Sequence, residues 1–295
     1  MKLVKGIAIL ACFSVLFGSC FDPPEFPTVP EIVFQDITFC DVADGPDTLS
    51  VYIKFKDGDG DLGVDPQHPK YSSPPYHFAD FYQNLAGNFS KVTVLSGQIT
   101  SGNNSTLVDV LDLADPTAGD LIFPRTRKNP AYTSQLPPYT CEFYDYRDFV
   151  IHNTDTAALD KFSVYKDTLG DKNDPYYVIT DTLYHTSNPN HYNIEVDWFI
   201  LVDPNSSVHE TRYREYDWKK ERCTTYDGRF PILSETNNTA LDGTLRYSME
   251  SRGFQILFGG KTMKLRVQIK DRLLNKSNII DTGDFTLESI RKCGN

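Results

Sequence analysis

A two-residue alternation of apolar and polar side chains runs through long parts of this chain and restricts its fold more than any other feature. The alternation is clearest in Leu49–Phe55, Ile194–Ile200 and Met263–Ile269. In the last segment Met, Leu, Val and Ile alternate with Lys, Arg and Gln. Because successive side chains of a β-strand point to opposite faces, this pattern predicts strands with one buried face and one wetter face.

Shorter segments of the same kind recur along the chain, separated by turn residues that include 18 glycines and 18 prolines. No convincing amphipathic helical pattern competes with them. Short strands with frequent turns predict an all-β protein, an antiparallel β-sandwich of immunoglobulin-like type, built as one decorated or two tandem sandwich domains with long loops. The further predicted strands are Ile32–Phe39, Val92–Leu95, Leu107–Leu113, Phe143–Ile151, Phe162–Lys166, Tyr177–Leu183, Leu245–Met249, Phe254–Phe258 and Phe285–Ser289.

A proline-rich stretch, Asp115–Pro138, interrupts the strand pattern near the middle of the chain. Long segments of this composition form loops, and loops of this length often carry binding specificity. We therefore predict a boundary here, with a β-rich domain over residues 32–138 and an Ig-like sandwich over residues 139–295.

Charge and motif content exclude several classes of function. The 295 residues include 40 acidic and 29 basic side chains, a formal net charge of −11, and no run of basic residues. Nucleic-acid binding needs clustered cations against phosphate, so we expect no nucleic-acid partner. The chain has no Walker loop, no GxGxxG, no HExxH and no GxSxG. We accordingly assign no catalytic residue.

The N-terminus has the features of an export signal. Lys2 and Lys5 precede an apolar stretch, Ile7–Phe17, that is too short to span a bilayer, and Gly18-Ser19 leads to Cys20. The sequence resembles a bacterial lipobox, although Phe17 stands where Leu is usual. It predicts a lipoprotein signal peptide over residues 1–19, acylation of Cys20 (palmitate among the chains), and a proline-rich tether over residues 20–31. The alternative is an ordinary signal peptide with an incidental cysteine.

Four cysteines remain after the signal peptide and Cys20 are set aside. They are Cys40, Cys141, Cys223 and Cys293. Four thiols in an exported chain allow two disulfides in three pairings, and none lies in a CxxC pair that would favour zinc or redox chemistry. We predict at least one disulfide, with four buried free thiols as the alternative.

The sharpest chemical motif is the acidic turn Asp57-Gly-Asp-Gly-Asp-Leu-Gly-Val-Asp65. Carboxylates at Asp57, Asp59, Asp61 and Asp65 occupy positions one, three, five and nine of a tight loop, where their oxygens can converge on Ca²⁺. Leu62 stands where an EF-hand requires glycine, so the match to that motif is incomplete. We predict a calcium site, with a solvated hairpin turn capped by its own side chains as the alternative.

Two motifs together give a family resemblance. The segment KFKDGDGDLG, ending at Gly63, and the later motif Asp271-Arg-Leu-Leu-Asn-Lys-Ser-Asn278, followed by Phe285–Leu287, resemble uncharacterised surface lipoproteins of the Bacteroidetes type. The segments Tyr226–Pro231 and Gly243–Tyr247 are similar as well. The resemblance implies an Ig-like sandwich and a cell-envelope location, as an outer-membrane lipoprotein facing the periplasm or the surface. It implies no known activity.

A second motif is typical of such bacteria. The tripeptide Asp-Thr-(small or aliphatic) occurs four times and is similar to a periplasmic O-glycosylation motif, which makes threonines the predicted sites. These are Thr48, Thr156, Thr168 and Thr182.

Aromatic residues, with 17 tyrosines and 19 phenylalanines, give the best indication of a binding role. Exposed aromatics near amides and acids form sugar-stacking or protein-binding patches, although packing in cores is the commoner use. We expect a non-enzymatic, lipid-anchored envelope protein that binds a glycan or another protein and is attached to the membrane through its lipid. The alternative is a carbohydrate-active hydrolase with carboxylates that no motif reveals, such as Glu215, Asp217 or Glu221 around Trp218.

Overall fold

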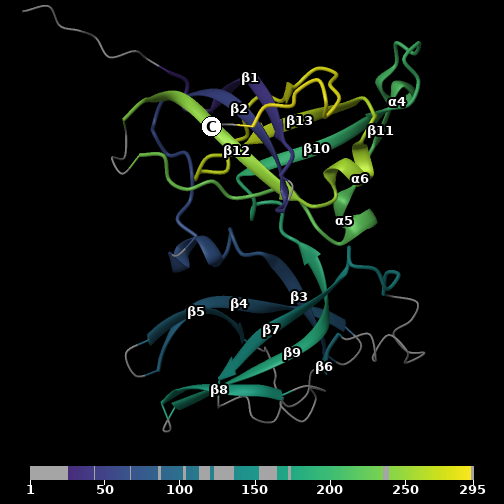
Figure 1. Ribbon diagram of the computed structural model, residues 1–295. Coiled ribbons are helices and arrows are strands. Elements are labelled where there is room, and N and C mark those ends of the chain that lie inside the picture. The colour runs from purple at the N-terminus through teal and green to yellow at the C-terminus, as the bar shows by residue number, and fades with distance from the viewer. Residues whose placement is uncertain are drawn as a thin grey trace, which may run out of the picture.

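The computed structural model describes residues 26–42, 44–66, 68–85, 88–101, 104–112, 120–122, 136–152, 165–171, 174–234 and 239–293. These residues form an all-β protein with mainly antiparallel sheets, as the alternation predicted. Figure 1 shows two stacked β-units, with a sandwich above and a larger sheet below. The predicted signal peptide, Cys20 and the tether as far as Glu25 lie outside the described residues.

The sandwich packs a three-stranded sheet against a four-stranded sheet. The first sheet has the order β1-β2-β12 and contains β1 (Glu31–Cys40), β2 (Asp47–Asp57) and β12 (Leu241–Ser251). The second has the order β11-β10-β13-β14 and contains β11 (Tyr213–Glu215), β10 (Ile194–Leu201), β13 (Met263–Ile269) and β14 (Ile280–Asp281). All pairings within both sheets are antiparallel.

The alternating residues fill the space between these two sheets. Leu49, Val51 and Ile53 of β2 are fully buried, and β10 and β13 contribute a matching row that includes Trp198 and Leu265. Trp198 stacks on two phenylalanines at ring distances of 5.4 and 5.5 Å. Burial of a large apolar side chain contributes about 1.5–3 kcal/mol, so this row is the main source of stability in the sandwich.

The lower unit is a seven-stranded sheet with the order β6-β3-β4-β5-β7-β9-β8 and an additional pairing between β3 and β9. Its strands are β3 (Ala79–Leu85), β4 (Asn88–Ser101), β5 (Asn104–Asp112), β6 (Asp120–Leu121), β7 (Tyr144–His152), β8 (Tyr165–Asp171) and β9 (Asp174–Ser187). The β3–β9 pairing closes five of these strands into a ring. One parallel pairing, between β5 and β7, departs from the antiparallel pattern.

The chain enters the lower unit after β2 and leaves it through β9, which runs up into β10 (Figure 1). The sandwich is therefore single and carries the seven-stranded sheet as an insertion. Its strands come from both sides of residue 138, because β2 pairs with β12 along its whole length. The division predicted between residues 32–138 and 139–295 thus does not follow the sheets, and the immunoglobulin-like character of the sandwich stays a prediction.

Four short helices complete the described structure: η1 (Pro69–Ser72), α4 (His209–Arg212), α5 (Trp218–Arg222) and α6 (Phe254–Phe258). The strand predicted at Phe254–Phe258 was wrong. Alternation would bury Ile256, but Ile256 is 84% exposed while Phe254 and Phe258 are buried. Residues four apart lie on one face of a helix, so a helical turn buries both phenylalanines against Trp198.

The strand predicted at Phe285–Ser289 is reduced to a single bridge. Phe285 pairs with Met263, and the chain then turns. Thr286 and Ser289 form reciprocal hydrogen bonds between their side chains and backbone groups, which closes this turn. Local bonding by hydroxyl side chains competes with a sheet ladder. Within the described residues, no helix is long and apolar enough to cross a membrane.

Candidate functional site

The acidic turn begins where β2 ends. Asp57, the last residue of β2, is fully buried, and Asp59 and Asp61 follow it half-buried. One carboxylate oxygen from each of these three residues lies within 4.8 Å of the others. Two oxygens bound to one Ca²⁺ at about 2.4 Å can be at most about 4.8 Å apart, so this spacing fits a shared calcium ion.

Asp65, the fourth predicted ligand, does not belong to this group. The chain is held away from the cluster after Asp61. Leu62 pairs with Asp271, and the Val64 amide donates to the Phe230 carbonyl at 3.1 Å. The structure therefore brings together three of the four predicted ligands.

Two glycines allow the turn to approach its neighbours closely. Gly60 and Gly63 have φ values of +71° and +88°, in the left-handed region. A Cβ at Gly60 would lie 2.2 Å from the Thr239 carbonyl oxygen, and one at Gly63 would lie 2.1 Å from the Pro231 carbonyl oxygen. The turn is also closed internally, because the Asp61 amide donates to Asp57 Oδ2 at 2.9 Å. The two glycines and this hydrogen bond together determine the backbone conformation that presents the carboxylates.

The later motif at residues 271–278 packs directly against the acidic turn. The Arg272 amide donates to the Asp61 carbonyl at 3.2 Å, and the Arg272 guanidinium donates to carbonyls of the turn at 3.3–3.4 Å. Asp271 is 2% exposed, and its carboxylate accepts two hydrogen bonds from Asn275 at 2.8 Å. This contact could not be predicted from the sequence, since the two motifs are more than 200 residues apart.

The cluster is electrostatically crowded. Burial, together with the charge of Asp59, raises the pKa of Asp57 to about 6. Burial and the charges of Asp271, Asp59 and Asp57 raise the pKa of Asp61 to about 7. The Oδ1 atoms of Asp57, Asp59 and Asp61 are buried and accept no hydrogen bond from any residue that the structure describes. Buried carboxylate oxygens that accept no hydrogen bond are costly, and a cation would relieve both the repulsion and the lost hydration.

A second candidate site is a cleft between the two β-units, with a volume of about 570 Å³. We call it the junction cleft. The lower unit contributes residues such as Phe78 and Glu142, and the sandwich contributes residues such as Trp198 and Tyr226. Its acidic residues are Glu142, Asp145, Glu195, Asp197, Glu215, Asp217 and Asp227. Glu215 and Asp217, suggested by sequence as carboxylates near Trp218, line this cleft, whereas Glu221 is not part of its lining.

The four candidate cysteines form two disulfides, where at least one was predicted. Cys141 pairs with Cys223 at a Cα separation of 5.3 Å, and this bond joins the lower unit to the sandwich at the wall of the junction cleft. Cys40 pairs with Cys293 at a Cα separation of 4.6 Å and holds the C-terminal segment against β1. The connectivity, which sequence left open among three pairings, follows from these positions.

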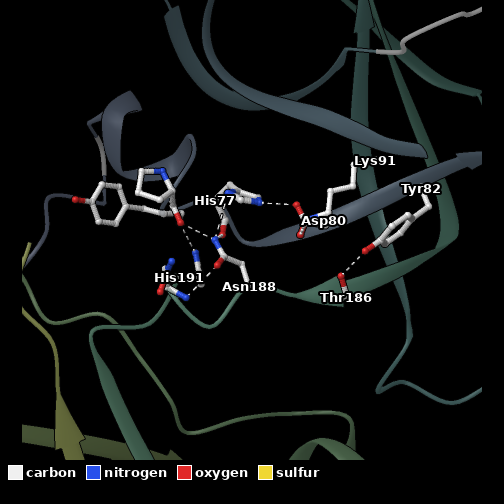
Figure 2. A network of polar contacts seen from close by, with 10 residues as sticks. His77, Asp80, Tyr82, Lys91, Thr186, Asn188 and His191 are labelled. Carbon is white, nitrogen blue, oxygen red and sulfur yellow. Dashed lines mark hydrogen bonds and ion pairs between the residues drawn. The ribbon is translucent and has the colours of Figure 1, made fainter. Parts of the chain in front are cut away.

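A polar network beside the cleft ties the start of β3 to the loop after β9 (Figure 2). Asp80 accepts from His77 at 2.9 Å and from Lys91 at 2.6 Å. The Asn188 amide donates to the carbonyls of Pro75 and His77, both at 2.7 Å. Because Asn188 is buried, these bonds fix the entry and exit of the inserted unit relative to each other.

The predicted glycosylation sites are spread over both units. Thr48 lies in β2 and Thr182 in β9, and both are partly buried, while Thr168 lies in β8. Thr156 lies outside the described residues. Glycosylation of these threonines stays a prediction.

Comparison of the chain with known protein families, curated proteins and solved structures found no match.

Proposed function

We propose that this chain is a lipid-anchored, non-enzymatic binding protein of the cell envelope whose acidic turn holds a calcium ion. The observation that carries the proposal is the convergence of Asp57, Asp59 and Asp61, each with a buried oxygen that accepts no hydrogen bond within the described part of the chain. Carboxylate oxygens in a tight loop are the ligands that Ca²⁺ prefers. Calcium bound there neutralises the cluster and stiffens the turn.

The surroundings of the turn indicate what calcium would do for the fold. The same few residues contact the end of β2, the segment around Pro231 and the motif at residues 271–278. Asp271 lies close enough to raise the pKa of Asp61, so it adds negative charge next to the three ligands. We infer that calcium links the N-terminal and C-terminal parts of the sandwich and holds the molecule in one arrangement for binding.

The anchor and the ligand complete the proposal. Acylation at Cys20 would attach the protein to the outer membrane, facing the periplasm or the surface, with the proline-rich tether between lipid and domain. The bound partner would be a glycan or an envelope protein. Support for a binding role comes from the junction cleft, whose volume of about 570 Å³ lies within the usual range of ligand sites.

Calcium is expected to stabilise the mature protein against heat. At a free concentration one hundred times the dissociation constant, one site adds about 2.7 kcal/mol. Melting curves in EGTA and in millimolar Ca²⁺ measure this. Asp59→Asn/Asp61→Asn should abolish the response, and Mg²⁺ should replace calcium poorly because it requires tight octahedral geometry. Asp242→Asn/Glu250→Asn on β12 is a control with the same loss of charge outside the cluster, and it should respond like the wild type. A wild-type melting temperature indifferent to calcium would count against the site.

The lipid anchor is expected to depend on one residue. Metabolic labelling with a tagged palmitate should mark the wild-type protein and leave Cys20→Ala unlabelled, because the diacylglycerol-modified cysteine is the residue after the cleavage site. Cys12→Ala, which changes a cysteine within the signal peptide, is the matched control and should label normally. Equal labelling of the wild type and Cys20→Ala would remove the anchor from this account.

A further inference from the structure

We propose that one end of the sandwich docks on the surface of the membrane that holds the lipid anchor. We call it the turn end, because it carries the acidic turn together with residues 229–234 and 271–278, which contact that turn. The inference rests on the proposed anchor at Cys20 and adds the face that the anchored protein turns toward the lipid. It does not require a bound calcium ion.

The register of the strands places the turn end where the chain enters the sandwich. Glu31, the first residue of β1, pairs with Lys56 close to the end of β2. Leu241, the first residue of β12, pairs with Asp57 at the start of the acidic turn. From there β12 runs along the sandwich toward α6 at the opposite end (Figure 1). The N-terminal segment and the acidic turn therefore share one end of the sandwich.

The last residues of the proline-rich tether are held against the acidic turn. The Gly58 amide donates to the Pro27 carbonyl at 2.8 Å, and Lys56 Nζ lies 5.3 Å from the centre of the Phe26 ring. A Cβ at Gly58 would lie 2.2 Å from the Phe26 carbonyl oxygen, so the two backbones are in close contact. Phe26 follows Cys20 by six residues. Since an extended chain covers at most about 3.6 Å per residue, Phe26 lies within roughly 22 Å of the acylated cysteine.

Exposed aliphatic side chains lie at this end of the sandwich. Leu273 is 68% exposed, and Ile232 is exposed to a smaller degree. Both belong to segments that touch the acidic turn. The Arg272 amide donates to the Asp61 carbonyl at 3.2 Å, and a Cβ at Gly63 would lie 2.7 Å from the Ile232 Cα. Apolar side chains leave water when they enter a membrane interface, so a lipid surface within reach of the tether would cover them.

A groove lined by basic side chains lies beside these aliphatic residues. Its volume is about 640 Å³, and Tyr71 and Ile232 contribute apolar surface to it. Lys70 and Arg272 line the same groove, and Asp65 is the one carboxylate among the described residues that do so. This local excess of cations contrasts with the net charge of −11 of the whole chain. Cations beside apolar side chains are typical of membrane-binding surfaces, because they meet the phosphates of the lipid headgroups.

The opposite end of the sandwich also exposes an aliphatic side chain and supplies a matched control. Ile256 of α6 is 84% exposed. It follows the far end of β12, whose 11 residues, at about 3.3 Å each, extend roughly 36 Å from the turn end. Because the short tether is held at the turn end, that end faces the lipid and Ile256 lies away from it.

Fluorescence quenching of the lipidated protein in vesicles tests this inference. Leu273→Cys carries a nitrobenzoxadiazole label, and Ile256→Cys carries the same label as the control. Both positions are exposed, so the fold should persist. The four cysteines of the folded domain are paired in disulfides and Cys20 is acylated, so only the new thiol reacts. The vesicles contain phosphatidylethanolamine, phosphatidylglycerol and a nitroxide-labelled lipid. EGTA is present throughout, so that a failure of the calcium proposal leaves the result unaffected.

Charge reversal examines the part of the basic groove. Lys70→Glu should reduce quenching of the label on Leu273→Cys at least twofold, because a carboxylate is repelled by the anionic lipid. Lys261→Glu makes the same change at an exposed position beyond α6 and should leave the quenching unaltered. Equal quenching in the two reversed variants would remove the groove from the docking face.

We expect the label on Leu273→Cys to lose more than half of its fluorescence to the nitroxide lipid, and the label on Ile256→Cys to lose less than a tenth. Vesicle flotation separates this result from the anchor itself, because protein that floats is anchored. Floated protein with both labels quenched equally, or neither, would overturn the docking face and leave the anchor intact. Protein that does not float would refute the anchor and the docking face with it. A blue shift of the label on Leu273→Cys that grows with protein concentration without vesicles would show that a second copy covers this end, and would also overturn the inference.

Discussion

Replacing Cys40 and Cys293 with serine is expected to lower the free energy of unfolding by about 4–5 kcal/mol. The disulfide joins residues 253 positions apart, so it restricts nearly the whole mature chain in the unfolded state. Chain-entropy arguments give larger stabilisation for longer loops. In the folded state the bond also secures the C-terminal segment, where the Lys292 amide donates to the Phe39 carbonyl at 2.7 Å. Since whole domains are stable by only about 5–15 kcal/mol, the loss should be large.

Urea denaturation under oxidising conditions measures this effect. Cys141→Ser/Cys223→Ser is the matched comparison, because its loop of 82 residues is shorter and the expected loss is slightly smaller. That variant should also loosen the junction between the two units and raise protease sensitivity there. Wild type and Cys40→Ser/Cys293→Ser unfolding at the same urea concentration would show that the bond does not form or does not matter.

Calcium-free protein is expected to lose stability as pH rises from 4 to 8. The pKa of Asp57 rises from 3.8 in the unfolded chain to about 6 in the fold, and that of Asp61 rises from 3.8 to about 7. The folded protein therefore keeps protons that the unfolded chain has already released, and ionisation penalises the fold as pH passes through these values. One pKa unit corresponds to about 1.4 kcal/mol, so Asp57 alone costs roughly 3 kcal/mol at pH 8.

Unfolding in EGTA across this pH range tests the sign and the size of the effect. Asp57→Asn/Asp61→Asn removes both carboxylates with raised pKa values and should flatten the profile, whereas Asp242→Asn, exposed on β12, should leave it unchanged. Saturating calcium should also flatten the wild-type profile above pH 6, because the ion stabilises the ionised carboxylates. Calcium-free protein that gains stability between pH 5 and 8 would contradict the crowding described for the acidic turn.

The strands were predictable because their side chains alternate and one face is buried. Leu49–Phe55 and Met263–Ile269 are strands in the structure, and their apolar residues face the core. The same reasoning failed at Phe254–Phe258, where two phenylalanines four residues apart fit a helical turn as well as a strand. Short apolar segments are ambiguous, and packing against Trp198 decided the outcome.

Which distant strands pair with each other could not be predicted from the sequence. The alternation of apolar and polar residues in β2 and β12 predicts that each is a strand. It does not predict that the two strands pair across the inserted unit. The acidic turn was recognised from its spacing, yet the exclusion of Asp65 follows from backbone bonds of Val64 and Leu62 to distant segments. The contact of Asp271 and Arg272 with the acidic turn likewise joins segments that are far apart in the chain. Such contacts depend on topology, which local patterns do not encode.

The number of calcium ions bound per mature chain tests the central claim most directly. After equilibrium dialysis against micromolar Ca²⁺, mass spectrometry of the bound metal should find one ion per wild-type chain, since three carboxylates converge at one point. Asp57→Asn/Asp59→Asn should retain none, and Asp65→Asn should retain one, because Asp65 lies outside the converging group. Wild-type protein that binds no calcium, or a variant without Asp57 and Asp59 that binds it equally well, would contradict the account.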